Sequence, residues 1–277
     1  MRMCQVLEVA ASGYHAWRRR AVSPREEANQ GLLEQIREAH AESRGVYGSP
    51  RVHNWLRQRG VACGRQRVAR LMRMAGIVGV RRHRRQPPRS QAGAETTVRP
   101  NLLGQDFEAD GPNQKWAADM TYIDTREGWL YLAVVLDLFS RRVVGWSMAD
   151  NRESGLVEDA LRMAIGSRRP AHGWMHHSDR GSEYASRAYQ EHLTKLKAKV
   201  SMSGTGNCYD NAVVESFFAT LKGEWGWSRF DTRGEARQHV FEFIELWYNR
   251  RRLHSTLGYL SPAEFERRLR SPLTGVH

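Results

Sequence analysis

The chain reads KWAADMTYIDTREGWLYLAVVLDLFSRRVVGWSM over residues 115–148, and this stretch decides its fold. Three apolar runs in it are rich in β-branched and aromatic residues, which favour extended strands in a half-buried sheet. The polar segment DTREG and the SRR turn separate these runs. The simplest interpretation is an antiparallel meander of three strands.

The segments that follow alternate between helical and strand patterns. The apolar spacing predicts helices at 153–166, 183–197, 211–225 and 234–250, a last helix from the Ser-Pro turn at 261–262, and short strands at 173–177 and 199–202. The order β-β-β-α-β-α-β-α is typical of an α/β fold, and its βαβ crossover makes the sheet partly parallel. We therefore expect a mixed sheet flanked by helices over residues 115–277, with a C-terminal helical extension.

The N-terminal region is predicted to be all helical, forming a domain over residues 1–78. Helical spacing indicates helices at 25–43, 51–59 and 65–75. The last two are joined by a tight turn, so residues 45–78 resemble a helix-turn-helix motif. The third helix carries candidate DNA contacts on a basic face: Arg67, Arg70 and Arg73. A plain helical bundle with a charged exterior fits the same pattern.

The charge of the chain lies in its first third. The net charge is +13, and residues 1–105 supply all of it, with 20 Arg against 7 Glu and neither Lys nor Asp. A localised Arg-rich region is typical of proteins that bind nucleic acid, because a guanidinium group can bind two phosphate oxygens. A merely solubilising surface is the alternative interpretation. Residues 79–114 are interpreted as a basic linker, in which four arginines surround His83 and are further candidates for DNA contact: Arg81, Arg82, Arg84 and Arg85.

Bulk composition excludes several classes of protein. Hydrophobic residues make up 40% of the 277 residues, which is enough for a packed core. No apolar run is long enough to predict a membrane span, and no secretory signal is apparent. Three widely spaced cysteines argue against a disulfide framework or a cysteine zinc site, and favour a reducing cytoplasm.

Three acidic residues stand out by their context. Asp119 lies inside an apolar strand, where a carboxylate is costly unless it is paired or binds a metal. Asp179 closes the strand in HHSDRGSEY, and Glu215 lies on the helix after a glycine-rich loop. Phosphodiester cleavage and strand transfer can use divalent cations, which carboxylates hold, to stabilise the attacking and leaving oxygens.

The spacing and flanking sequences resemble a known family. Thirty-five residues separate Asp179 from Glu215, and the chain carries the strings WAADMTYI, HSDRGSEY, DNAVVESFFATLKGE and YNRRRLHSTLGYLSPAEF. This pattern resembles retroviral integrases and, over nearly the whole length, the downstream product of insertion sequences that encode a transposase in two reading frames. The resemblance implies a ribonuclease H-like fold and a DDE transposase that cleaves and joins DNA. It also implies Mg²⁺, for which Mn²⁺ can substitute.

The resemblance implies partners as well. They are double-stranded DNA, as terminal inverted repeats and target, and a homo-oligomer on paired ends. An upstream-frame helix-turn-helix and leucine-zipper protein, separate or fused to the chain, is a further expected partner. Lys222, two turns after Glu215, resembles a DNA-end contact of the family. Asn211 shares its helix face and is a further candidate for DNA contact. His177 is interpreted as orienting Asp179 or contacting DNA.

Other charged residues have less specific interpretations. Asp137 is expected to pair with Arg141 or Arg142 or to cap the turn, and Asp210 to cap the helix that carries Glu215. The three arginines 250–252 are either DNA contacts or a solvated patch.

Two other functions remain open at this point. A metal-dependent nuclease on the same fold would use the same acids. A non-catalytic DNA-binding regulator would use the basic helices, although the intact acidic triad argues against it.

Overall fold

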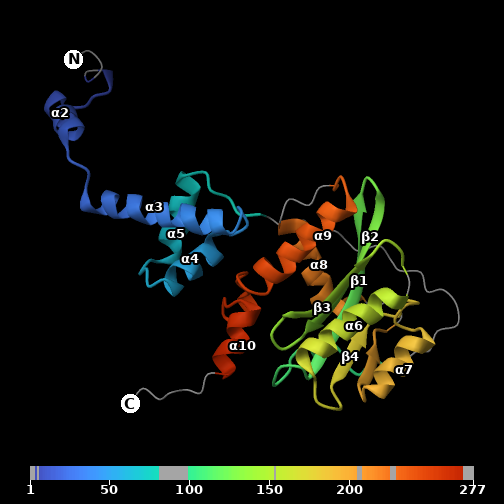
Figure 1. Cartoon of the computed structure of the whole chain (residues 1–277). Helices are drawn as coiled ribbons and strands as arrows, with labels where there is room; N and C mark the ends of the chain where they lie inside the picture. Colours follow the sequence, from blue (N-terminus) through green and yellow to red (C-terminus); the bar gives the residue numbers. More distant parts are fainter. Residues whose placement is uncertain are drawn as a thin grey trace, which may run out of the picture. The chain divides into compact units, whose positions relative to one another are not determined.

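The structure is a computed structural model of the protein and describes residues 4, 6–80, 99–152, 154–204, 208–224 and 229–270. The chain divides into two compact units, Met1–Gly79 and Val80–His277, whose elements are labelled in Figure 1. Within the described residues, no helix combines the length and apolar character that a membrane span requires.

The first unit is built from helices: α2 (Ala11–Arg19), α3 (Pro24–Glu42), α4 (Ser49–Gln58) and α5 (Arg65–Met74). The predicted helices at 25–43, 51–59 and 65–75 are confirmed to within two residues. Helix α3 begins where its sequence directs, because the Ser23 hydroxyl accepts a hydrogen bond from the Glu26 N–H and Pro24 occupies the first turn. Helix α2 was not predicted; it buries none of its residues and therefore has no apolar stripe fixed by packing.

Helices α3, α4 and α5 share one small core. Ile36, Val52 and Val68 lie at its centre, and each is fully buried. At the rim, the Trp55 indole N–H donates to Glu42, and the Arg59 guanidinium lies 3.4 Å from the centre of the Trp55 ring. Gly60 ends the turn after α4 with a positive φ of 79°, which glycine adopts without strain. The α4–turn–α5 arrangement agrees with the predicted helix-turn-helix.

The second unit contains a five-stranded mixed sheet in the order β3-β2-β1-β4-β5. Its strands are β1 (Lys115–Thr125), β2 (Gly128–Asp137), β3 (Val143–Ala149), β4 (Met175–Ser178) and β5 (Lys199–Met202). The first three form the predicted antiparallel meander, whereas β4 pairs with β1, and β5 with β4, in parallel. The predicted mixed α/β fold is confirmed.

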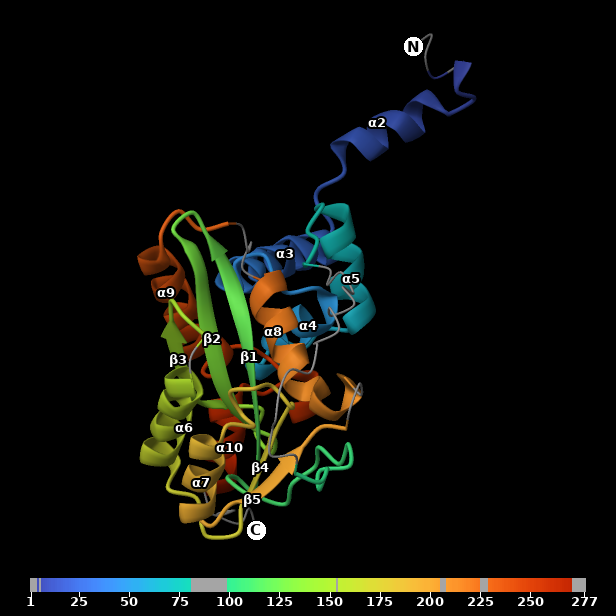
Figure 2. The same cartoon turned by 90° about the vertical axis from the view of Figure 1, so that its right-hand side faces the viewer.

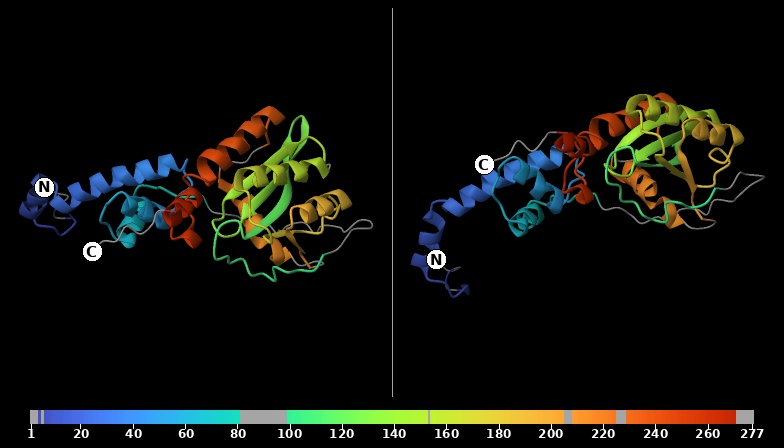
Figure 3. Two further views of the ribbon diagram at one scale, coloured as in Figure 1. Left: turned by 60° about the horizontal axis from the view of Figure 1, so that its bottom comes forward. Right: turned by 90° about the horizontal axis from the view of Figure 1, so that it is seen from below.

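Helices cover both faces of the sheet, as Figure 3 shows. Helices α6 (Ser154–Arg168) and α7 (Arg187–Lys195) pack on one face, over a core that includes Trp116 and Ala118 of β1. Gly145 in β3 lets α6 approach, because a Cβ atom there would collide with the backbone of Ala160 and Ala164. Helix α8 (Ala212–Glu224), preceded by the 3-10 turn Cys208–Asn211, runs beside β1 on the opposite face (Figure 2).

The C-terminal elements follow α8 and are hydrogen-bonded to the edge strand β3. They are α9 (Arg233–Phe241), the π-helix Glu242–Tyr248, the 3-10 turn Ser255–Leu257 and α10 (Pro262–Arg270). The segment 234–250 was predicted as one helix; the α-helix instead ends at Phe241 and widens into the π-helix. Just beyond it, the Asn249 amide bonds both the N–H and the carbonyl of Val143, each at 3.0 Å. Asn249 therefore satisfies backbone groups of the edge strand β3.

Residues 99–114, predicted as the end of a linker, belong to the second unit and are hydrogen-bonded to the rest of it. The backbone N–H groups of Leu102 and Leu103 both donate to the Ser201 hydroxyl. The buried Asp210 accepts from the side chains of Asn101 and Gln105 and from the Gly204 N–H. These bonds show that Asp210 fastens loops together, a role that the expected cap of α8 did not include.

Candidate active site

Strand β1 places Asp119 on the face that α8 covers. Side chains alternate along a strand, so Asp119 and Thr121 share one face while Ala118 points to the α6–α7 core. The Asp119 carboxylate accepts a hydrogen bond of 2.7 Å from the Met120 N–H. In the register with β2, Asp119 lies opposite the fully buried Val134.

Asp179 lies beside Asp119 because β1 and β4 are parallel neighbours. Ala118 pairs with Ser178, and each acid is the next residue after this pair. Both carboxylates are therefore carried by neighbouring strands at the same level of the sheet. The Gly181 N–H donates to Asp179 Oδ1 at 2.9 Å and fixes the turn that follows β4.

Glu215 approaches from α8, which is tied to β1 on either side of it. The Asn211 amide donates to the Ala118 carbonyl at 3.2 Å, and Lys222 Nζ donates to Thr121 Oγ1 at 2.7 Å. The two ties flank Asp119 in β1 and Glu215 in α8. The three predicted acids thus come together from two strands and one helix.

The acids act on one another electrostatically. Burial and then the negative charge of Asp179 raise the pKa of Asp119 well above its usual value, and the charge of Glu215 adds to this. The Met120 N–H and the Lys222 ammonium act in the opposite direction. Burial also raises the pKa of Asp179 and of Glu215. Within the described residues, no three His, Cys, Asp or Glu side chains are already gathered as metal ligands.

Three further side chains surround Asp179. Glu183 is almost fully buried and is paired with Arg152, whose Nε lies 2.5 Å from its carboxylate. The Tyr184 hydroxyl is buried without a hydrogen-bond partner in the described part of the chain. Its pKa is raised well above the usual value by burial, Tyr189, Asp119, Asp179 and Glu183. These residues were not predicted from the sequence, although Glu183 and Tyr184 lie in the same string as Asp179.

Two predicted DNA contacts are contradicted by their burial. His177 is fully buried, and its ring nitrogens are hydrogen-bonded to the hydroxyls of Ser201 at 2.8 Å and Ser203 at 3.2 Å. Burial lowers the pKa of His177 to about 4. Asn211 is 4% exposed and is tied to β1, so it positions α8 and cannot reach DNA from this location.

The remaining predicted contacts are placed differently. Lys222 is half-buried at the site and lies 5.0 Å from the centre of the Tyr122 ring. In the first unit, Arg70 and Arg73 are exposed on α5, whereas Arg67 is partly buried and its Nε donates to Asn29 Oδ1 at 2.9 Å. The linker arginines lie outside the described residues: Arg81, Arg82, Arg84 and Arg85.

Other charged residues of interest have structural roles. The buried Asp137 accepts hydrogen bonds from the N–H groups of Asn113 and Phe139 and forms an ion pair with Arg168. The expectation that it would pair with Arg141 or Arg142 was wrong. Its contact with Phe139 agrees with the alternative that it caps the turn.

Arg252 is also buried. Two of its guanidinium nitrogens bind the Glu224 carboxylate, at 2.6 and 2.5 Å. Arginines 250–252 were interpreted as DNA contacts or as a solvated patch. Arg252 fits neither interpretation, because its side chain is buried.

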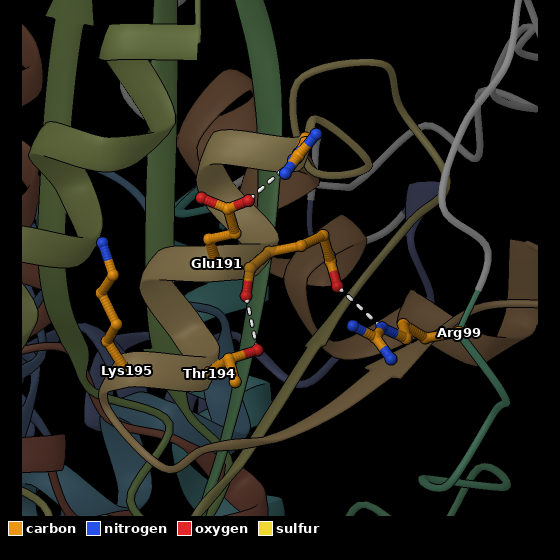
Figure 4. A pocket seen from close by; sticks show the side chains of 6 residues that line it. Arg99, Glu191, Thr194 and Lys195 are labelled. Carbon is orange, nitrogen blue, oxygen red and sulfur yellow. Dashed lines mark hydrogen bonds and ion pairs between the residues drawn. The ribbon is translucent and has the colours of Figure 1, made fainter.

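A surface cavity of about 300 Å³ on α7 is separate from the acids (Figure 4). Arg99 Nε donates to the Gln190 side chain there, and Arg187 is paired with Glu191. None of the three acids lines this cavity.

Comparison with known proteins identifies the domains. Residues 109–208 and 196–262 match families described as integrase core domain, and residues 26–85 match an HTH-like domain. The chain is 45% identical over 267 residues to the transposase InsF for insertion sequence IS3A of Escherichia coli (strain K12), covering 95% of this chain and 92% of the relative. It is 42% identical to the insertion element IS600 uncharacterized 31 kDa protein of Shigella sonnei, covering 95% and 97%. It is 43% identical to the transposase for insertion sequence element IS904 of Lactococcus lactis, covering 85% and 93%.

An integrase core preceded by a helix-turn-helix domain defines a DNA transposase of the DDE type, which is a polynucleotidyl transferase. The chain belongs to the IS3 family of insertion-sequence transposases, and it acts in insertion-sequence transposition and integration. The family resemblance and the enzyme class predicted from the sequence are confirmed.

More distant likeness is found among solved structures. A chain of the simian T-cell lymphotropic virus intasome in complex with PP2A regulatory subunit B56 gamma aligns with a TM-score of 0.47 at 15% identity, covering 87% of this chain and 76% of that one. The HTLV-2 integrase catalytic core domain in complex with magnesium aligns with a TM-score of 0.43 at 18% identity, covering 56% and 97%.

Proposed function

We propose that Asp119, Asp179 and Glu215 are the catalytic acids of this transposase and that they hold Mg²⁺, for which Mn²⁺ can substitute. The observation that carries the proposal is the Asp119 carboxylate, which is built into a strand beside a second acid and facing a third. Burial, together with the negative charges of these two acids, raises its pKa. A carboxylate cluster without enough positive charge of its own is a good binding site for a divalent cation.

The donor set fits this cation. Mg²⁺ prefers carboxylate and carbonyl oxygens and retains several waters, so few protein ligands suffice. The His177 imidazole does not compete for the cation, because both of its ring nitrogens are hydrogen-bonded to Ser201 and Ser203. The buried Asn211 Oδ1, which has no hydrogen-bond partner among the described residues, is a further hard oxygen at the start of α8.

Each residue then has a defined part in DNA 3′-end cleavage and strand transfer. A bound cation supplies Lewis-acid stabilisation of the phosphate oxygens on which charge develops. The three carboxylates hold it, and Asn211 keeps α8 against β1. Lys222 offers its ammonium group to a DNA phosphate beside the site. Water attacks in end cleavage and a DNA 3′-hydroxyl attacks in strand transfer, so no covalent bond between protein and DNA is required.

The helix-turn-helix unit is proposed to bind double-stranded DNA at the terminal inverted repeats, with the core engaging target DNA. Support comes from α5, the second helix of the motif, which exposes Arg70 and Arg73. Replacing both by alanine should weaken binding to a labelled terminal duplex. The slope of the logarithm of the binding constant against the logarithm of the salt concentration should become shallower, by the amount expected for the loss of about two phosphate contacts. Replacing the exposed Arg37 of α3 serves as the control. Unchanged binding in the double variant would contradict this assignment.

We also propose that the protein works as a homo-oligomer on paired DNA ends. It would act on the nucleoid in the bacterial cytoplasm. The upstream-frame helix-turn-helix and leucine-zipper protein would be its partner. Support comes from apolar side chains near the N-terminus: Val6, Leu7 and Trp17 are 80%, 68% and 68% exposed. Exposed apolar residues of this size are typical of protein contacts. Sedimentation of the protein with and without terminal DNA, and with the upstream protein added, tests these partners.

The catalytic assignment is tested by strand transfer in vitro. Purified protein is mixed with Mg²⁺ or Mn²⁺ and a duplex that carries the element's own end. Asp119→Asn and Glu215→Gln remove single acids. Asp124→Asn is the matched control, because Asp124 lies in the same strand but pairs with Arg229 away from the site.

The expected result is cation-dependent joined product in the wild type and in Asp124→Asn, with loss in the two acid variants. Cleavage without joined product would show that the protein hydrolyses DNA but does not transfer strands, as a nuclease does. Full activity of Asp119→Asn or Glu215→Gln would refute the assigned acids.

A further inference from the structure

A fourth carboxylate lies next to the proposed metal site. Glu183 follows Asp179 in the turn between β4 and α7 and is only 6% exposed. Gly181 separates the two acids and shows how near they are. A Cβ atom on Gly181 would lie 3.0 Å from Asp179 Oδ1 and 3.2 Å from Glu183 Oε2. The two carboxylate oxygens are therefore within about 6 Å of each other, where charges interact strongly.

Arg152 neutralises this fourth acid. Its Nε lies 2.5 Å from Glu183 Oε1, and its Nη2 donates to Oε2 at 3.3 Å, so the guanidinium holds both carboxylate oxygens. Arg152 comes from the connection between β3 and α6, whereas Glu183 comes from the turn after β4. The pair joins two loops at the edge of the site. The Arg152 side chain is 55% exposed, so its replacement leaves no large cavity.

We infer that the Arg152–Glu183 pair sets the affinity of the Asp119–Asp179–Glu215 site for its divalent cation. The inference rests on the proposed function. With Arg152 present, Glu183 adds almost no net charge beside Asp179. Without Arg152, an uncompensated buried carboxylate adds its attraction for the cation. Without Glu183, the Arg152 guanidinium is left as a positive charge that repels the cation. The two residues are positioning and charge-balancing groups, not catalytic ones.

The charge that each substitution removes decides whether cation binding becomes tighter or weaker. Arg152→Gln should tighten cation binding by roughly tenfold, and Glu183→Gln should weaken it by roughly tenfold, each equivalent to about 1.4 kcal/mol. The double variant should bind nearly as the wild type does, because a neutral pair replaces a balanced one. Arg152→Lys keeps the charge and should also bind as the wild type does. A purely structural ion pair would instead give the same loss in both single variants.

The experiment uses the full chain and measures binding apart from catalysis. Mn²⁺ binding is followed through the electron paramagnetic resonance signal of the free ion, and MgCl₂ is titrated while Tm is recorded. Arg162→Gln is the matched control: it removes an arginine from the exposed Arg162–Asp159 pair on α6. Glu215→Gln serves as the variant with an incomplete site.

Opposite shifts in the two single variants, with recovery in the double variant, support the inference. Equal affinities in the wild type and Arg152→Gln would overturn it while leaving the metal site in place. If neither cation binds the wild type more tightly than it binds Glu215→Gln, the proposed metal site fails, and the inference fails with it.

Discussion

Replacing Asp119 by asparagine should stabilise the protein in the absence of divalent cations. Asparagine keeps the shape of the side chain, and its oxygen can accept the hydrogen bond that Asp119 takes from the Met120 N–H. The substitution removes a charge that burial, Asp179 and Glu215 all disfavour. Acids selected for catalysis commonly reduce the stability of the fold in this way.

The magnitude follows from the register of the sheet. Asp119 and Asp179 follow paired residues of adjacent strands, which lie about 4.8 Å apart. Two unit charges about 5 Å apart interact by about 3 kcal/mol at an effective dielectric constant of about 20. Lys222 offsets part of this repulsion. We therefore expect a gain of about 1–3 kcal/mol, or roughly 2–4 °C in Tm for each kcal/mol in a domain of this size.

The pH dependence gives the prediction a second readout. Because the pKa of Asp119 is raised in the folded state, the folded protein holds a proton that the unfolded chain releases as pH rises above about 4. The destabilisation is thus absent at low pH and grows as pH rises. The stability difference between Asp119→Asn and the wild type should be near zero at pH 4 and reach its full size at neutral pH.

Urea and thermal unfolding in EDTA measure the effect. The control is Glu266→Gln, because Glu266 is buried but binds Arg168, Arg142 and Ser140, which lower its pKa. Removing that charge should destabilise the protein by about 3–5 kcal/mol. An Asp119→Asn variant no more stable than the wild type at pH 7.5 would refute the reasoning.

Three further predictions concern other buried polar groups. Arg252→Ala should destabilise the protein by about 3–5 kcal/mol in urea unfolding, because the buried Glu224 would lose both of its bonds from this guanidinium; undiminished stability would reopen a DNA-contact role. Burial lowers the pKa of His176 to about 3 and of His177 to about 4, so only the unfolded chain takes up protons as pH falls below about 6.5. The free energy of unfolding should therefore drop by about 2 kcal/mol for each histidine between pH 7 and pH 5, and a His177→Gln variant should show about half this slope. Tyr184→Phe should change stability by less than about 0.5 kcal/mol, since the lost hydroxyl has no partner among the described residues; a drop of 2 kcal/mol or more would show that the hydroxyl is hydrogen-bonded.

The fold was predictable where apolar periodicity is strong. The meander of β1 to β3 and the helices that carry Leu56, Val68 and Glu215 follow from local spacing. The partly parallel character of the sheet follows from the βαβ crossover that leads from β3 through α6 to β4. These features depend on residues that are close in the sequence.

Partners distant in the sequence were not predictable. His177 looked available for DNA contact. Strand β4 is an inner strand covered on both faces, so the side chains that point to either face of the sheet are buried. Asn211 bonds a carbonyl of β1, and Arg252 pairs with Glu224. Asp137 prefers Arg168 to the arginines next to it in the sequence, because the sheet turns the acid towards the end of α6.

The parallel pairing of β1 with β4 also bears on when the enzyme can act. Asp119 leaves the ribosome long before Glu215, and the residue that fastens β3, Asn249, follows later still. Contacts between segments so distant in the sequence form slowly and only after the intervening chain is made. A nascent or prematurely ended chain therefore carries the first acids without a formed site. Under the proposed assignment of the three acids, DNA cleavage therefore requires a chain that has been made at least through α8.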